Sequence, residues 1–545
     1  MRRVCARGVG MDYPCQTGKK MKLRHIDRER LKEIVMKKIC TLLLCAGMLI
    51  GAATGASAID FKAKGQWLVG IGMVDTDLIH KYRDGHQKYK NTSDQFQAAQ
   101  RVRLQLDAVA NEFLSGTVYF EIGNQRWGQA ETGGALGADG KMVKLKRAYI
   151  DWMVPETELS VRMGIQGVTM PNVAGGSDIM DTDVAGITAS YKINDNVSLT
   201  ALWARPLNDN YPGQPGKGAF SDAGYLDNMD LFSLMVPVAY DGFEITPWVM
   251  YGIKGRNSMK GIDSWQGFQD GFSTMDGNLP YSLYPYPGID NVQNIGGTNK
   301  TYGSMFWAGL PISYTALDPW NFELDLNYGY VEAMGRYWAE KSYYHQWKRS
   351  STERQGWLAK ALIEYKMDWG VPGVLGWYGS GDDGDPKNGS ERMPTIVPMG
   401  TFTSFMGDGN LGWIWNDYAL DYAGTWGAGI QIRDVSFLED LTHTFRAVWW
   451  GGTNSTGMVK YMNNAYAWND GWASNNSPYL TTNDGLLEFN LVTNYQMYEN
   501  FAVNLDLGYV ANFMDNSTWD KAGSRNSSFS KQDAWKATLV FNYSF

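Results

Sequence analysis

Apolar side chains occupy every second position of residues 535–545, and mostly polar ones lie between them. Successive side chains of a β-strand point to opposite faces, so this segment predicts a strand with one apolar and one polar face. The chain stops on the aromatic Phe545. Taken alone, the segment fits the last strand of a soluble sandwich as well as that of a lipid-facing barrel.

The same alternation recurs along the chain and predicts eighteen strands. The clearest lie at 321–331 and 487–497, where Phe, Leu and Tyr alternate with Glu, Asp and Asn. The predicted strands cover 61–73, 95–109, 114–125, 142–153, 159–166, 184–193, 198–205, 229–240, 243–254, 304–316, 320–332, 354–366, 373–379, 421–433, 441–451, 485–497, 500–513 and 534–545. If two weak segments fail, of which 373–379 is the weakest, the number is sixteen.

The connections between these strands alternate in length. Tight turns lie at 194–196, 241–242, 317–319 and 498–500, whereas long Gly-rich connections lie at 74–94, 206–228, 255–303, 333–353, 380–420 and 452–484. Short turns at one rim and long loops at the other are typical of a membrane barrel, and such loops argue against a compact soluble domain. The polar face carries charge in strand after strand, as a wet lumen requires. We therefore predict an all-β fold, a closed antiparallel transmembrane β-barrel with long extracellular loops and short periplasmic turns.

Charge and cysteine content exclude several classes of function. Residues 1–58 hold 12 basic and 4 acidic residues, so the remainder of the chain has a formal charge of −16. Such an acidic protein is a poor partner for nucleic acid. All four cysteines precede residue 59, which excludes a zinc–thiolate site from the rest of the chain.

Residues 36–58 have the pattern of a secretory signal peptide. Two lysines precede an apolar run that ends in small residues at Ala58. This order predicts export with cleavage after Ala58. Residues 1–35 are basic and unpatterned and precede a signal that has its own methionine, so we interpret them as an extension from a start site placed too early. A single barrel domain is predicted over 59–545.

Three stretches carry a resemblance to a known family. They are Arg-Ala-Tyr-Ile-Asp-Trp at 147–152, Arg-Met-Gly-Ile-Gln at 162–166 and Gly-Gly-Ser-Asp-Ile-Met-Asp-Thr-Asp-Val-Ala-Gly at 175–186. With the export signal, the alternating strands and the terminal Phe545, they resemble the homotrimeric porins of sulfate-reducing bacteria, among the general trimeric porins of Gram-negative outer membranes. The resemblance covers about 59–545, although the chain is long for a general porin.

The resemblance implies a homotrimer of water-filled barrels in the outer membrane, in contact with lipid and lipopolysaccharide. Such barrels pass small hydrophilic solutes by passive diffusion. The first and last strands should pair and close the barrel, which removes both sheet edges. The resemblance also implies that Phe541, Tyr543 and Phe545 form the signal read by the outer-membrane barrel assembly machinery.

In porins of this type the third long loop folds into the barrel, which here is the segment 167–183. It contains Pro171, Gly175 and Gly176, which permit a sharp course, and the carboxylates of Asp178, Asp181 and Asp183. The inward positions of neighbouring strands carry Arg101, Arg103, Arg147 and Arg162. Carboxylates opposed to guanidiniums across a narrow water path create a transverse field. We expect this constriction to favour small anions such as sulfate, unless the arginines are simply solvated or pair with Asp107, Glu121 and Asp151.

A carbohydrate-selective porin is the alternative function. The inward positions also carry Trp248, Trp307, Trp450 and Tyr149, which could stack on sugar rings along an aromatic slide. The same tryptophans could instead fill space beneath an inward loop.

No pattern of residues indicates an enzyme. The histidines at 80, 86, 345 and 443 are isolated, and the chain has no nucleophile elbow, phosphate-binding loop or paired metal-ligand motif. The run Asp382-Asp383-Gly384-Asp385 could bind calcium or bridge lipopolysaccharide, but the remaining ligands of a calcium loop are missing and a solvated loop tip fits as well. We predict no catalytic residue, metal or cofactor.

Overall fold

The computed structural model describes residues 59–75, 78, 82–83, 87–88, 96–130, 133–137, 143–208, 228–255, 273–274, 277–278, 283, 292–296, 300–341, 346–403, 421–462, 479–521 and 531–545. Contacts divide the chain into 1–58 and 59–545, and every described residue belongs to the second unit. The predictions for 1–35, for the signal at 36–58 and for the histidines at 80, 86 and 345 lie outside the described residues.

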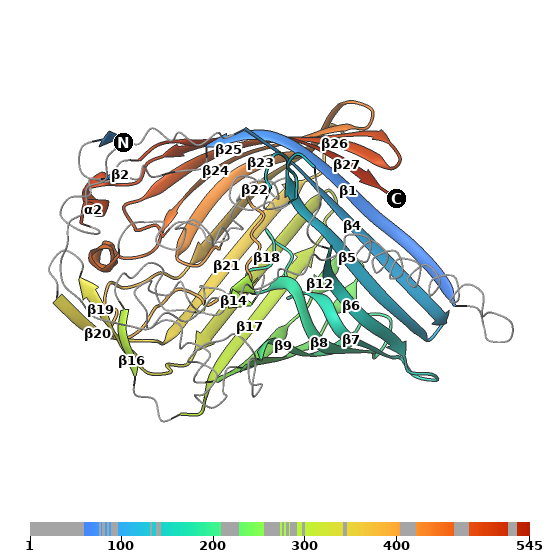
Figure 1. Ribbon diagram of the computed structural model, residues 1–545, viewed down its shortest axis with the longest axis horizontal. Helices are drawn as coiled ribbons and strands as arrows, with labels where there is room; N and C mark the ends of the chain where they lie inside the picture. Colours follow the sequence, from blue (N-terminus) through green and yellow to red (C-terminus); the bar gives the residue numbers. More distant parts are fainter. Residues whose placement is uncertain are drawn as a thin grey trace, which may run out of the picture. The chain divides into compact units, whose positions relative to one another are not determined.

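Eighteen antiparallel strands close into one ring (Figure 1). The main sheet has twenty segments, because short breaks at 236–237 and 246–247 each divide one strand in two. In ring order the segments are β1 (Asp60–Asp75), β4 (Phe96–Asn111), β5 (Leu114–Arg126), β6 (Val143–Met153), β7 (Leu159–Thr169), β8 (Asp181–Lys192), β9 (Ser198–Asn208), β10 (Asn228–Met235) with β11 (Val238–Tyr240), β12 (Phe243–Ile245) with β13 (Trp248–Gly255), β17 (Tyr302–Tyr314), β18 (Trp320–Val331), β21 (Arg354–Tyr365), β22 (Val371–Gly379), β23 (Thr425–Leu438), β24 (Leu441–Gly452), β25 (Gly485–Tyr498), β26 (Phe501–Asn512) and β27 (Ala534–Ser544). The prediction of eighteen strands is confirmed, and its weakest member is β22.

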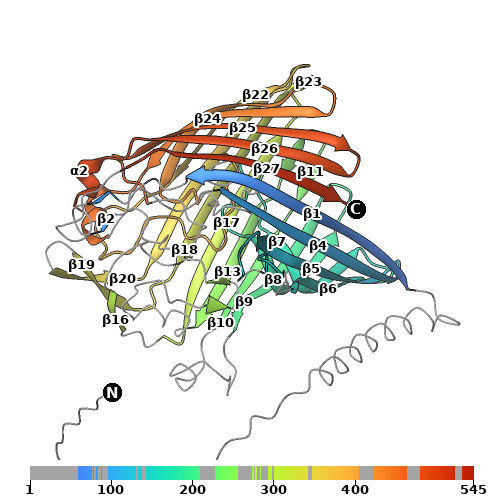
Figure 2. The same cartoon turned by 45° about the horizontal axis from the view of Figure 1, so that its top comes forward.

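The first and last strands close the ring as the sequence predicts. β27 pairs with β1 from Ser544 opposite Gln66 to Trp535 opposite Asp75, and β1 lies between β27 and β4 (Figure 2). Gly65 and Phe545 exchange two backbone hydrogen bonds, with N···O distances of 2.7 and 3.0 Å. Because each strand has a neighbour on both sides, the sheet exposes no edge.

The two rims of the barrel differ as the sequence predicts. The eight connections at one rim have at most five residues each, and the connections at the other rim are longer. The long connections contain β16 (Val292–Gly296), β19 (Arg336–Lys341) and β20 (Gln346–Ser351), which form a separate sheet. They also contain the strand pairs β2 (Tyr82–Arg83) with β3 (Gln87–Lys88) and β14 (Ser273–Thr274) with β15 (Gly277–Asn278), the 3-10 helix η5 (Thr456–Tyr461) and the helix α2 (Asn516–Trp519). No helix within the described ranges is long and apolar enough to cross a bilayer.

The outer face of the barrel is apolar. Large hydrophobic side chains are exposed on outward positions around the ring, for example Ile150, Leu326, Ile430 and Phe489, which are 42–61% exposed. A continuous apolar exterior would be unstable in water and is what a barrel that faces lipid requires.

Part of the interior is a packed apolar core. Trp248, Trp307, Trp377 and Trp450 point inward from β13, β17, β22 and β24 and are at most 5% exposed. They belong to one buried cluster with loop residues that include Met170, Ile179, Met393, Phe402 and Met458. The sequence predicts a charged, wet lumen, with tryptophans that could either stack on sugars or fill space beneath an inward loop. In this part of the wall loops from the long rim fold in and cover the tryptophans.

Candidate functional site

The connection between β7 and β8, residues 170–180 and here named L3, turns into the barrel. Gly175 and Gly176 at its tip have φ of 64° and 87°, a left-handed backbone that residues with side chains rarely adopt. A Cβ at Gly176 would also collide with the carbonyl oxygen of Met399. L3 is therefore the inward third loop that the sequence predicts, although β7 and β8 extend further into the segment than expected.

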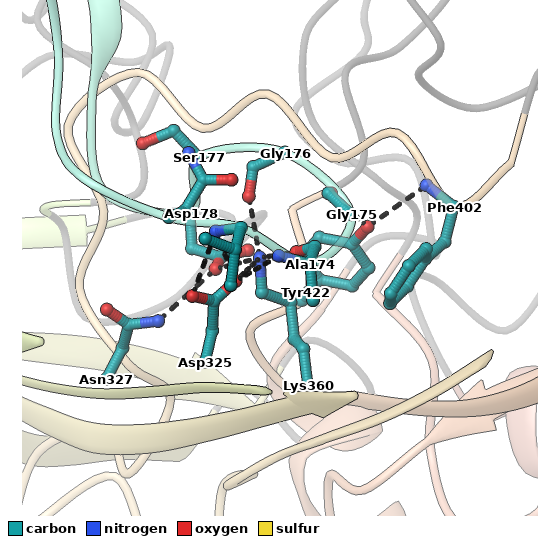
Figure 3. Close-up of polar contacts among 12 residues, drawn as sticks. Ala174, Gly175, Gly176, Ser177, Asp178, Asp325, Asn327, Lys360, Phe402 and Tyr422 are labelled. Carbon is teal, nitrogen blue, oxygen red and sulfur yellow. Dashed lines mark hydrogen bonds and ion pairs between the residues drawn. The ribbon is translucent and has the colours of Figure 1, made fainter. Parts of the chain in front are cut away.

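Lys360 on β21 holds the tip of L3. Its Nζ lies 2.5 Å from the carbonyl oxygen of Ala174, 2.6 Å from that of Gly176 and 2.7 Å from Oδ2 of Asp178 (Figure 3). On the adjacent strand β18, Asp325 lies directly opposite Lys360 and accepts a hydrogen bond of 2.8 Å from the backbone N–H of Ala174. Since β21 is six strands round the ring from β8, L3 reaches a distant part of the wall.

Tyr422 and Phe402 secure the other side of the tip. The hydroxyl of Tyr422 donates to the carbonyl oxygen of Gly175 at 2.6 Å and accepts from the backbone N–H of Phe402 at 3.2 Å. The Tyr422 ring centroid lies 5.2 Å from Nζ of Lys360, within the range of a cation–π interaction. These bonds fix L3 between the wall and the connection that follows β22.

Asp178 has an unusual protonation equilibrium because it lies in this buried anchor. Burial raises the pKa of the Asp178 carboxyl to about 7, against the opposing effect of Lys360, and the carboxyls of Asp325 and Asp421 add to the rise. The charge of the anchor therefore changes near neutral pH.

A cluster of four cations and two carboxylates lies on the inner face of β4–β8, and we name it the basic wall. Nε of Arg103 lies 2.7 Å from Glu121. Nε of Arg147 and Nζ of Lys146 lie 2.5 and 2.6 Å from the two carboxylate oxygens of Asp183. The sixth member, Arg101, lies beside Arg103 and interacts with Glu121. The basic wall has a formal excess of two positive charges.

Water reaches the basic wall but not the anchor of L3. The side chains of Arg103, Lys146 and Arg147 are 23%, 27% and 39% exposed, whereas those of Lys360 and Asp178 are 0% and 1% exposed. A hydrated path can therefore run along the basic wall.

The other predicted site residues occupy different positions. Arg162 donates two hydrogen bonds of 2.6 and 2.9 Å to Asp151 and lies 4.2 Å from the centroid of the Tyr149 ring. Asp181 accepts from the hydroxyl of Thr169 at the base of L3. Asp178, expected to face the arginines, pairs with Lys360 instead. Two of the three alternative pairings considered for the arginines, those with Glu121 and Asp151, are present.

Sequence reasoning missed three members of these clusters. Lys360 and Asp325 occupy inward positions of their strands, which the alternating pattern predicts. The pattern does not predict that both contact the tip of L3 at Ala174. Lys146 was missed because β5 and β6 shift register between Tyr119 and Phe120, and this bulge turns both Lys146 and Arg147 toward Asp183.

The tryptophans considered for an aromatic slide are covered by loops. The indole N–H of Trp248 donates to the carbonyl oxygen of Pro171 at 3.1 Å, and that of Trp307 donates to Pro394 at 2.9 Å. Trp307 and Trp450 are 0% exposed. Their inward parity is as predicted, but loop residues occupy the space in which a sugar would stack.

Two carboxylates of the acidic run that follows β22 have partners within the protein. Asp382 is buried and accepts from the hydroxyls of Ser390 and Tyr479 at 2.6 and 2.7 Å, and Asp385 pairs with Lys348 at 2.5 Å. Across the described part of the chain, no group of three or more His, Cys, Asp and Glu side chains is arranged to hold a metal ion. Nδ1 of His443 lies 2.9 Å from the hydroxyl of Thr493.

The barrel is similar to the following solved structures. OpdQ of Pseudomonas aeruginosa is 11% identical, with a TM-score of 0.45 and coverage of 89% of this chain and 98% of OpdQ. OccAB1 of Acinetobacter baumannii is 10% identical, with a TM-score of 0.46 and coverage of 90% and 98%. The outer membrane channel DcaP of the same species is 10% identical, with a TM-score of 0.37 and coverage of 89% and 97%. No family model and no curated protein matches this chain. Likeness at this identity concerns the fold, so no residue role is carried over.

Proposed function

We propose that this protein is an outer-membrane channel for the passive diffusion of small hydrophilic solutes, and that it favours small anions such as sulfate. The solute path follows the basic wall past L3. The opposite part of the interior is filled by packed loops and tryptophans, which restricts the path to one side of the barrel.

The observation that carries the anion preference is that four cations share two carboxylates. Arg101, Arg103, Lys146 and Arg147 bring four positive charges to one inner face, where Glu121 and Asp183 bring two negative charges. In a narrow path with low-dielectric walls, fixed charge of one sign concentrates counter-ions and repels co-ions. Arg162 extends the same inner face toward the short-turn rim, although Asp151 neutralises its charge.

The proposed function requires a membrane location and a route of assembly. The apolar exterior supports a location in the outer membrane of a Gram-negative bacterium. There the protein would assemble as a homotrimer, after export by the signal at 36–58. The barrel assembly machinery and lipopolysaccharide are its expected partners there. Phe541, Tyr543 and Phe545 would be read by that machinery, and the 45% exposure of the last two side chains supports their accessibility.

Reversal potentials in a salt gradient test the anion preference. We expect the protein in planar bilayers to pass chloride and sulfate more readily than potassium. Arg101→Gln and Arg103→Gln together should shift the reversal potential toward cations, because they remove two of the four positive charges of the basic wall. Arg205→Gln on β9 is the matched control, since Arg205 pairs with Asp230 outside the basic wall. An unchanged preference in the double variant, or an equal shift in the control, would contradict the proposal.

A further inference from the structure

The sheet of β16, β19 and β20 stands beyond the long-loop rim (Figure 1). Its two faces carry different kinds of side chain. On the inner face, Tyr337, Ala339 and Ser350 are 0% exposed. Tyr337 lies within electrostatic range of Asp382 and Tyr461, which belong to inward-folded loops. Lys348 on this face is paired with Asp385 at 2.5 Å. The inner face therefore covers the loops inside the barrel, and the other face points away from the pore.

The outer face combines exposed tryptophans with exposed arginines. Trp338 lies opposite Arg349 in the β19–β20 pair, and Trp347 lies opposite Glu340, so these side chains share one face with Arg336. Trp338 and Trp347 are 40% and 38% exposed, and both arginines are exposed. Glu340 is 6% exposed. Among the residues that the structure describes, neither Arg336 nor Arg349 forms an ion pair.

The sheet that carries the Trp–Arg face is connected directly to two strands of the lipid-facing wall. β19 and β20 form a hairpin that connects β18 to β21, and these strands expose Tyr328 and Trp357 on their outward faces. The Trp–Arg face is thus close in the chain to outward aromatic residues of the kind that mark a membrane interface. Its unpaired positive charge complements an anionic membrane surface.

We propose that the Trp–Arg face binds the phosphate-bearing headgroups of outer-leaflet lipids. The planar guanidiniums of Arg336 and Arg349 suit bidentate contact with phosphate, while Trp338 and Trp347 suit the boundary between headgroups and acyl chains. The inference rests on the proposed location in the outer membrane and goes beyond the channel function. It assigns the β16–β19–β20 sheet to the membrane surface.

Native mass spectrometry of the protein extracted in detergent tests this assignment, with diphosphoryl lipid A as the probe. The wild-type protein should retain lipid A, and Arg336→Gln with Arg349→Gln should weaken retention at least tenfold, since each cation near an anionic surface contributes appreciably. Lys62→Gln with Lys366→Gln is the matched control, because it removes two exposed cations near the opposite rim. Both double variants should keep the heat-modifiable mobility of a folded barrel.

Two further arms separate lipid headgroups from other anions. A soluble sulfated polysaccharide and inorganic pyrophosphate carry negative charge without acyl chains, so neither should displace lipid A at equal concentration. Trp338→Ser with Trp347→Ser should weaken the retention of lipid A. The same double variant should bind pyrophosphate as the wild-type protein does. Equal retention of lipid A by the wild-type protein and the arginine variant would overturn the proposal. So would an equal loss of lipid A retention in the lysine control variant, or tight binding of the polysaccharide without binding of lipid A. The channel conductance of the Arg336→Gln, Arg349→Gln variant should equal that of the wild-type protein. A failure of the channel proposal would be recognised separately, because the wild-type protein would then show no conductance.

Discussion

Lys360 and Asp178 form an ion pair between the barrel wall and L3, with 2.7 Å between Nζ and Oδ2 and side chains that are 0% and 1% exposed. A charge pair removed from water is costly unless additional hydrogen bonds satisfy it. Here the carbonyl oxygens of Ala174 and Gly176 accept from the same ammonium group. Lys360 is therefore one of the main contacts that hold L3 in place, together with Asp325 and Tyr422.

Replacing Lys360 by Met should release L3. The substitution leaves Asp178 and Asp325 buried together without their cation, and breaking such a buried pair typically costs about 3–5 kcal/mol. We expect larger and noisier single-channel currents than in the wild type. Lys366→Met is the control, because Lys366 is an exposed lysine in the turn that follows the same strand. Currents identical to those of the wild type would show that Lys360 does not hold the loop.

The anchor of L3 should weaken as the pH rises. The folded-state pKa of Asp178, about 7, lies above the roughly 3.9 of an unfolded aspartate. Its stabilising contribution is therefore fully present below about pH 4 and is lost as the pH rises through about 7. Hydrogen-exchange protection of the Ala174 amide, corrected for intrinsic rates, should be higher at pH 5 than at pH 8. Asp178→Asn should abolish this difference, and a difference that persists in the variant would assign it to another group.

Gly65 is required at the closing seam. A Cβ at this position would collide with the ring of Phe545 and with the carbonyl oxygen of Arg103. Gly65→Val should therefore reduce the yield of inserted barrel, as deletion of Phe545 should. Semi-native electrophoresis after refolding measures that yield, and Gly123→Val, where only the end of the Lys144 side chain is near, is the control. Normal insertion of Gly65→Val would show that the seam tolerates the added side chain.

Lys536 and Asp506 make a second buried pair, 2.6 Å apart with both side chains 0% exposed, between β27 and β26. Lys536→Met should lower the unfolding free energy by about 3–5 kcal/mol, because Asp506 would remain buried without its cation. Replacing both residues with Met and Leu should cost much less, since no unpaired charge remains. The midpoint of urea unfolding in detergent measures both effects, and equal losses in the single and double variants would exclude this explanation.

The strands could be predicted from sequence because their signal is local. Lipid on one side and a mostly polar interior on the other impose a two-residue period, which identified even the weak segment that became β22. Closure by β1 and β27 followed from the even number of strands. The sequence left two readings open where loops cover the wall. Trp307 and Trp450 satisfy the inward parity, but parity does not indicate whether water or a loop lies against them, and the structure has loops there.

The site was predicted only in part because its contacts join distant segments. Arg147 and Asp183 were both identified, but Lys146 was hidden by the bulge between β5 and β6. The pairing of Asp178 with Lys360 joins residues that are far apart in sequence, and no local period encodes it. The two-residue period of a strand predicts the face on which a charged side chain lies. The packing of the loops then determines which charged group it pairs with.

Solute entry into proteoliposomes tests the central claim most directly. Liposomes containing the protein should admit sulfate faster than a neutral polyol of similar size, at a rate proportional to the concentration difference and without an energy source. Neutralising Arg101 and Arg103 should bring the two rates together. Exclusion of both solutes by correctly inserted barrels, or faster entry of the neutral polyol into wild-type liposomes, would contradict an anion-favouring channel.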